Sequence, residues 1–185
     1  MSRHIKRMCF SLVFILAGCN SSENDEIDNA QVYQVEVAAK PTYAEPGTMH
    51  VNTLYVIATG LDGPDVRAGA ITGFNHRFGS SYRLEIRRYP STSSNEADYV
   101  HELVQVLEEN EDPAGTVYEY PQVTLVDEPV YVNSQGSYMM GPYPFLCGEG
   151  VDCDTLVEMN QSGGVVRIEL TLTGGDIPVT LTDWD

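Results

Sequence analysis

An alternation of apolar and polar residues with a period of two is the pattern that most constrains how this chain folds. In the segment QVYQVEV at 31–37, Tyr33, Val35 and Val37 share one side, and a glutamine and a glutamate lie on the other. The segment 81–88 alternates in the same way. Successive side chains of a β-strand point to opposite faces, so both segments are predicted to be half-buried strands of antiparallel sheet.

The last part of the chain predicts a hairpin. Residues 165–172 alternate, a Gly-Gly-Asp turn follows at 174–176, and a second alternating run covers 177–181. Further strands bounded by Pro, Gly or Asn are predicted at 50–59, 116–126 and 128–134. The expected fold class is therefore mainly β, with antiparallel strands forming a small barrel or sandwich and little helix outside the apolar N-terminus.

One segment, 99–108, fits two patterns. Val100, Leu103, Val104 and Leu107 have the spacing of one helix face, whereas the valines at 100, 104 and 106 also suit a strand with an imperfect face. Periodicity alone does not decide between helix and strand here.

The N-terminus has the order of an export signal, with basic residues in the first seven positions followed by an apolar run from 9 to 17. As a helix this run rises only about 14 Å, too little to cross about 30 Å of hydrocarbon. The next residues complete Leu16-Ala17-Gly18-Cys19, which resembles the lipobox of bacterial lipoproteins. The resemblance implies a signal peptide at 1–18 and a lipid on the thiol of Cys19, which would anchor the protein to a membrane.

Residues 19–30 include four acids and one large apolar residue, Ile27. Such a segment cannot bury enough surface to offset its ordering entropy, so it predicts a disordered acidic tether about 40 Å long when extended. No aspartate follows Cys19 at the second position. By resemblance to Gram-negative lipoproteins, this implies an outer-membrane anchor with the folded part facing the periplasm.

Counting the cysteines predicts a disulfide. Of the 4 cysteines, Cys9 would leave with the signal and Cys19 would carry the lipid, so Cys147 and Cys153 remain. An even pair suits an oxidising compartment. The alternatives are metal binding and redox exchange, but two thiols rarely make a zinc site and the spacing is not that of a CxxC motif.

Charge limits the partners of the folded part. The formal net charge is −17, and removal of residues 1–18, which carry three basic residues and no acid, would take it to −20. This excess of acid argues against nucleic acid and against anionic membrane surfaces as partners.

A family resemblance covers about residues 31–110. The stretch AITGFNHRFGSSYRLEIRRYP at 70–90, followed by ADYVHELVQVLEE, resembles the bacterial domain of unknown function 4377, whose signature is I-x-G-F-x-x-x-x-G-x-x-Y-x-L-x-V. The matching positions are Ile71, Gly73, Phe74, Gly79, Tyr82, Leu84 and Ile86. The resemblance implies a β domain at 31–110 in which 99–108 is a strand. It does not reach 115–185, a second β-rich segment with the hairpin and the disulfide loop, and the two parts could share one sheet system or form a small barrel and a packed hairpin unit. Many members are small lipoproteins, some beside a META-type heat-shock domain, and the family has no assigned activity.

Three groups of residues are candidate sites. Phe74 and Tyr82 of the signature could pack over the loop between Gly73 and Gly79, or form an aromatic platform for a ligand. The other candidates are an arginine pair two strand steps apart and three acids in the disulfide loop, namely Arg83 with Arg87, and Glu149 with Asp152 and Asp154. The arginines could hold a carboxylate, phosphate or sulfated group, or could neutralise neighbouring acids, and the three acids could bind calcium or form an exposed acidic turn.

Catalytic motifs are sparse. The sequence HELVQ at 101–105 lacks the second histidine of an HExxH zinc site, and His50 and His76 lie in no catalytic motif. We therefore expect no enzyme activity and no cofactor. The expected function is that of a lipid-anchored envelope protein, a non-catalytic interaction or stress-related accessory protein with an envelope protein partner. The alternatives are a small-ligand or ion-binding module that uses the arginine pair or the acidic loop, and, last, a hydrolase.

The lipobox resemblance predicts that Cys19→Ser abolishes lipidation and leaves the protein unprocessed or soluble. Metabolic labelling with a fatty acid and fractionation of membranes would measure this, with Cys9→Ser as the matched control that keeps its lipid. Normal membrane retention of the Cys19→Ser variant would contradict the prediction.

Overall fold

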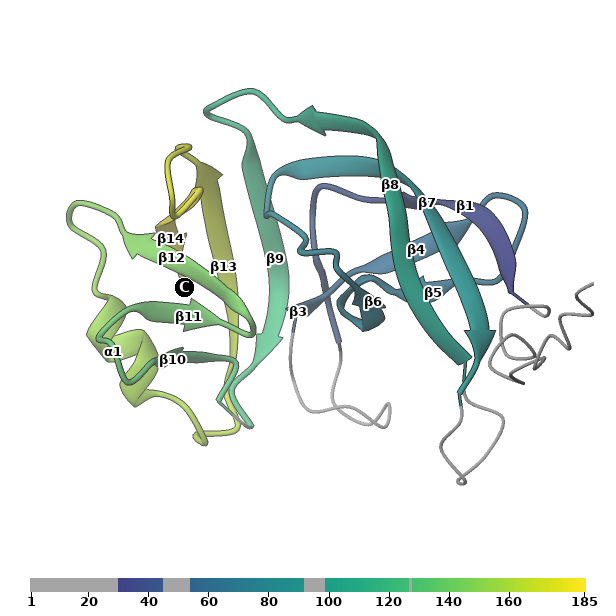
Figure 1. The fold of residues 1–185 in the computed structure, drawn as a ribbon. Helices are drawn as coiled ribbons and strands as arrows, with labels where there is room; N and C mark the ends of the chain where they lie inside the picture. The colour runs from purple at the N-terminus through teal and green to yellow at the C-terminus, as the bar shows by residue number, and fades with distance from the viewer. Residues whose placement is uncertain (1–29, 45–53, 92–98, 127) are drawn as a thin grey trace, which may run out of the picture.

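The computed structural model describes residues 30–44, 54–91, 99–126 and 128–185 (Figure 1). Within these residues the chain is mainly β, as predicted, with two six-stranded sheets, one two-stranded sheet and little helix. The predicted signal peptide at 1–18, Cys19 and the predicted tether up to residue 29 lie outside the described residues, as does His50. No helix in the described ranges is long and apolar enough to cross a membrane.

The first sheet curls into a nearly closed barrel. Its strand order is β5 (Val66–Arg67), β4 (Ile57–Gly60), β1 (Gln31–Val37), β7 (Ser80–Pro90), β8 (Tyr99–Glu111) and β6 (Ile71–Thr72). Neighbours are antiparallel except for β6 and β8. The predicted alternation of β1 and β7 is confirmed, because Val35, Leu84 and Ile86 are completely buried on the inner face.

The second sheet forms a half-barrel. Its order is β10 (Val130–Val132), β11 (Tyr138–Met140), β12 (Tyr143–Cys147), β14 (Val179–Trp184), β13 (Val165–Leu172) and β9 (Val117–Thr124). The predicted C-terminal hairpin is confirmed as the antiparallel pair β13 and β14, in which Leu172 lies opposite Val179. A two-stranded sheet of β2 (Thr42–Tyr43) and β3 (Leu54–Tyr55) completes the β structure of the described residues.

The structure decides the ambiguous segment 99–108 and adds one helix. Residues 99–108 are a strand, within the longer β8, because their partner β7 offers a full-length edge with which to pair. Helix α1 (Cys153–Glu158) was not predicted. It has only six residues, too few to show a helical period, and its signal is the Asp152 side chain, which accepts a hydrogen bond from the Thr155 N–H as an N-terminal cap.

The two sheets are built from residues 31–111 and 117–184, and their cores meet. Leu54 and Phe78 come from the first part of the chain but are buried in the core of the second sheet. The ring of Tyr143, from β12, packs against both cores. Packing therefore joins the two β-rich parts directly.

Of the two roles that the sequence allows for the rings of the signature segment, the structure shows packing in the core. The rings of Phe74 and Tyr82 are buried and meet edge to face with centroids 5.1 Å apart. Gly79 has φ +85°, and a Cβ placed there would lie 2.5 Å from Cδ1 of Leu172 in the second sheet. The Gly79 N–H also donates to the carbonyl of Ala39. Gly79 therefore allows a close approach of this loop to the second sheet.

A pair of glycine substitutions separates this packing from backbone strain. Gly115 also has positive φ, +91°, but a Cβ there meets no atom within 4 Å. We expect Gly115→Ala to cost about 1 to 2 kcal/mol from the left-handed backbone alone. Gly79→Ala should cost about 1 to 3 kcal/mol more, because its methyl group would overpack against Leu172. Urea denaturation measures both variants, and equal losses would contradict the close approach at Gly79.

Candidate functional site

The predicted arginine site is occupied by ion pairs. Arg83, on the outer face of β7, lies 3.1 Å from the carboxylate of Glu108 and 3.6 Å from that of Glu36. Arg87 lies 3.7 Å from the carboxylate of Glu102, its partner in the register with β8. Of the two roles that the sequence allows for Arg83 and Arg87, the structure shows the second, in which they neutralise neighbouring acids. Because these side chains are well exposed, each pair stabilises the fold by about 1 kcal/mol at most.

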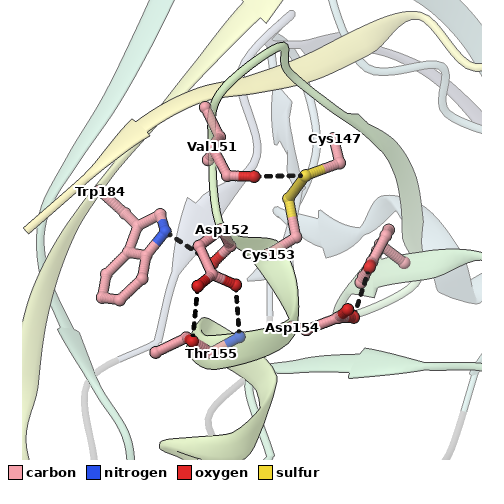
Figure 2. The surroundings of a disulfide bond; sticks show 8 residues. Cys147, Val151, Asp152, Cys153, Asp154, Thr155 and Trp184 are labelled. Carbon is pink, nitrogen blue, oxygen red and sulfur yellow. Dashed lines mark hydrogen bonds between the residues drawn. A yellow bond between two sulfur atoms is a disulfide. The ribbon is translucent and has the colours of Figure 1, made fainter.

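The predicted disulfide is confirmed. Cys147 at the end of β12 is bonded to Cys153 at the start of α1, with Cα atoms 6.1 Å apart (Figure 2). The indole N–H of Trp184 donates to the carbonyl of Asp152, 3.1 Å away. The disulfide and this hydrogen bond together hold the helix against the end of the second sheet.

The acids of the disulfide loop do not meet. Asp152 accepts hydrogen bonds from the N–H and hydroxyl of Thr155, whereas Asp154 accepts one from the hydroxyl of Tyr138 at 2.6 Å (Figure 2). The bonds from Thr155 lower the pKa of the Asp152 carboxyl. Glu149 is exposed. In the part of the chain that the structure describes, no three His, Cys, Asp or Glu residues are grouped to hold a metal ion.

A cleft of about 750 Å³ lies between the two sheets. One side is lined by the 3-10 helix η1 (Ala68–Ala70) and by the loop between Gly73 and Gly79, which we call the signature loop. The β11–β12 turn and the β13–β14 turn line the other side. Tyr55, Gly69, Phe74, His76, Tyr143 and Pro144 are among the lining residues. Aromatic, proline and small side chains thus dominate its surface.

His76 joins the two sheets at the cleft. Its Nε2 lies 2.8 Å from the carbonyl oxygen of Ala38, and its Nδ1 lies 2.9 Å from the hydroxyl of Tyr143. A carbonyl oxygen only accepts, so Nε2 carries the proton and Nδ1 accepts from the hydroxyl in the neutral ring. Burial lowers the pKa of His76, although the bond to Ala38 opposes this effect. The neutral imidazole therefore satisfies both partners.

Charged groups lie among the cleft residues. The guanidinium of Arg67 lies over the ring of Tyr55, 5.4 Å from its centroid. Arg77 donates to the carbonyl of Gly175 at 3.0 Å and lies 3.5 Å from Glu111. Asp176 lies on the side formed by the second sheet. An apolar concavity with a few polar groups is the usual form of a small-molecule site.

Sequence reasoning missed this cleft because its residues lie far apart in the chain, at 54–78 and 142–178. The sequence contains one signal, Phe74, for which an aromatic platform is one of the two alternatives, and Phe74 does line the cleft. Its signature partner Tyr82 is buried instead in the first core. Comparison with protein-family models, with curated proteins and with solved structures gave no match for this chain.

The hydrogen bonds of His76 predict a pH dependence of stability. The pKa of His76 is below 6.5 in the folded chain and returns to about that value on unfolding. The unfolded state therefore binds the proton more readily, so the free energy of unfolding should fall as the pH drops through 6.5 and stay level above it. Burial also lowers the pKa of His101, which adds a decline of the same sign.

Urea denaturation from about pH 8 to about pH 5.5 measures this dependence. We expect His76→Gln to make the decline shallower without abolishing it, since His101 remains. An unchanged slope in this variant would contradict the assignment of the neutral, hydrogen-bonded ring.

Proposed function

We propose that this chain is a lipid-anchored protein of the bacterial cell envelope that binds a ligand, without catalysis, in the cleft between its two sheets. The export signal and Leu16-Ala17-Gly18-Cys19 support the anchor. The disulfide between Cys147 and Cys153 supports an oxidising compartment. The absence of aspartate after Cys19 favours the outer membrane, with the folded part in the periplasm.

The cleft is the observation that carries the binding function. Residues of both sheets form its walls, so a ligand would contact parts of the chain that are distant in sequence. Binding fits this surface better than acid–base chemistry does, because both ring nitrogens of its histidine, His76, are taken by Ala38 and Tyr143. An envelope component, or an apolar side chain of an envelope protein, would suit walls of this kind.

The resemblance to the domain of unknown function 4377 agrees with this proposal, since many members of that family are small lipoproteins. It contributes no chemistry, because the family has no assigned activity. The arginine pair and the disulfide loop play no part in the proposed binding. Arg83 and Arg87 already contact carboxylates, and Asp152 and Asp154 already accept hydrogen bonds from neighbouring groups.

Filling the cleft tests the proposal. Gly69 lines it, and a Cβ built on Gly69 meets no atom within 4 Å, so a side chain there would project into open space. We expect anilinonaphthalene sulfonate, a fluorescent aromatic anion, to bind the wild-type chain saturably. Gly69→Trp should weaken that binding at least about tenfold, because the indole would occupy the volume that the probe needs.

Gly69→Ala is the matched control, because it makes the same backbone change and leaves the cleft open. The thermal unfolding midpoints of both variants should stay near that of the wild type, which excludes binding of the dye to partly unfolded chains. Equal dye binding by wild type and by a folded Gly69→Trp variant would refute the cleft as the binding site.

A further inference from the structure

A group of buried polar atoms at one end of the first barrel has no partner. Among the described residues, five buried side-chain nitrogen or oxygen atoms make no hydrogen bond, and three of them are the Tyr33 hydroxyl, Arg88 Nε and His101 Nε2. The remaining two are Arg83 Nε and Asn160 Oδ1, and the side-chain nitrogens Arg83 Nη1 and Asn160 Nδ2 do have partners. Leaving a buried polar group without a partner is costly, so such groups usually face water or an ion.

The three groups come from adjacent strands and share the inner face of the sheet. Arg88 on β7 lies opposite His101 on β8 in the register. Tyr33 on β1 lies opposite Ile86 of β7. Ile86 is two residues before Arg88, so the two side chains lie on the same face of β7. The rings of Tyr33 and His101 meet edge to face with centroids 6.5 Å apart. The strand pairing thus brings all three side chains to one place.

Electrostatics agree with this placement. Burial lowers the pKa of His101, and the positive charge of Arg88 lowers it further. Burial raises the pKa of Tyr33, and Arg88 opposes that rise. Arg88 therefore acts on both groups. Asp65 also acts on Tyr33, but its carboxylate accepts a hydrogen bond from the Gly60 N–H.

Arg88 is unusual among the arginines of this acidic chain. Of the six arginines in the described ranges, only Arg67 and Arg88 have no ion pair with a carboxylate. The guanidinium of Arg88 instead stacks on the ring of Tyr99, 3.4 Å from its centroid. This stacking holds a positive charge beside two further donors without neutralising it.

We propose that this end of the barrel binds a small oxyanion, a phosphate or carboxylate group, through the Tyr33 hydroxyl, Arg88 Nε and His101 Nε2. All three atoms are able to donate, the histidine as its Nε2–H tautomer. The several oxygens of an oxyanion can accept from all three donors at once, whereas a single water accepts at most two hydrogen bonds and would have to donate to the third group. Bonds from a guanidinium to an anion are also among the stronger hydrogen bonds in proteins. None of the three residues lines the cleft, so this site is independent of the proposed function.

Calorimetric titration of the purified full chain with inorganic phosphate, and separately with acetate, at constant ionic strength tests the site. We expect saturable binding of at least one anion at a single site. Arg88→Leu should weaken it at least about tenfold, and Tyr33→Phe about fivefold, since each removes a donor to the anion. Arg87→Leu is the matched control, because it removes one positive charge from the outer face of the same strand and should leave the affinity unchanged.

Tyr33→Phe keeps the ring that packs against Gly63, so this variant should fold and keep the test decisive. Failure of the wild type to bind either anion would overturn the proposal and leave the three atoms to buried water. An equal loss in Arg87→Leu would also overturn it, because the attraction would then be that of overall charge. Neither result bears on dye binding in the cleft.

Discussion

The packing of the signature loop against the second sheet is the contact on which the arrangement of the two sheets depends. Phe78 is buried there, with its ring edge-on to those of Tyr118 and Tyr143 at centroid distances of 5.1 and 5.5 Å. The neighbouring residue, Gly79, contributes no side chain, which is what allows Leu172 to approach its backbone. The bulky side chain of Phe78 thus fills the core of the second sheet, and the missing side chain of Gly79 leaves room for Leu172.

The cleft follows from this arrangement. The signature loop and β12 bring Phe78, His76 and Tyr143 into contact, and the hydrogen bond from Tyr120 to the carbonyl of Pro41 adds a second link between the sheets. A hollow remains between the barrel and the half-barrel beside this contact. His76 and Tyr143 both line the cleft, and the hydrogen bond between them also helps to hold the two sheets together. The proposed anion site lies elsewhere, on the inner face of the first sheet, and depends on strand pairing alone.

Much of the local structure could be predicted, because strand formation and disulfide pairing depend on patterns within one segment. The alternation around Val35 and Leu84 identified β1 and β7, and the cysteine count identified the pair at 147 and 153. The ambiguous segment at 99–108 became a strand because β7 is available along its length. The role of Arg83 could not be predicted, because cross-strand neighbours depend on register. The structure shows Glu36 and Glu108 beside it.

The sequence by itself determined the β class, the disulfide and the turns that need glycine, because these features arise from residues near one another or from simple pairing. It also contains the lipobox-like segment on which the proposed anchor depends. Only the tertiary structure decided which side chains meet across strands and sheets. His76 and Tyr143 are 67 residues apart, and Tyr33 and His101 lie on strands that β7 separates. Neither contact can be predicted from the spacing of residues in the sequence, because each depends on strand order, register and the packing of one sheet against another.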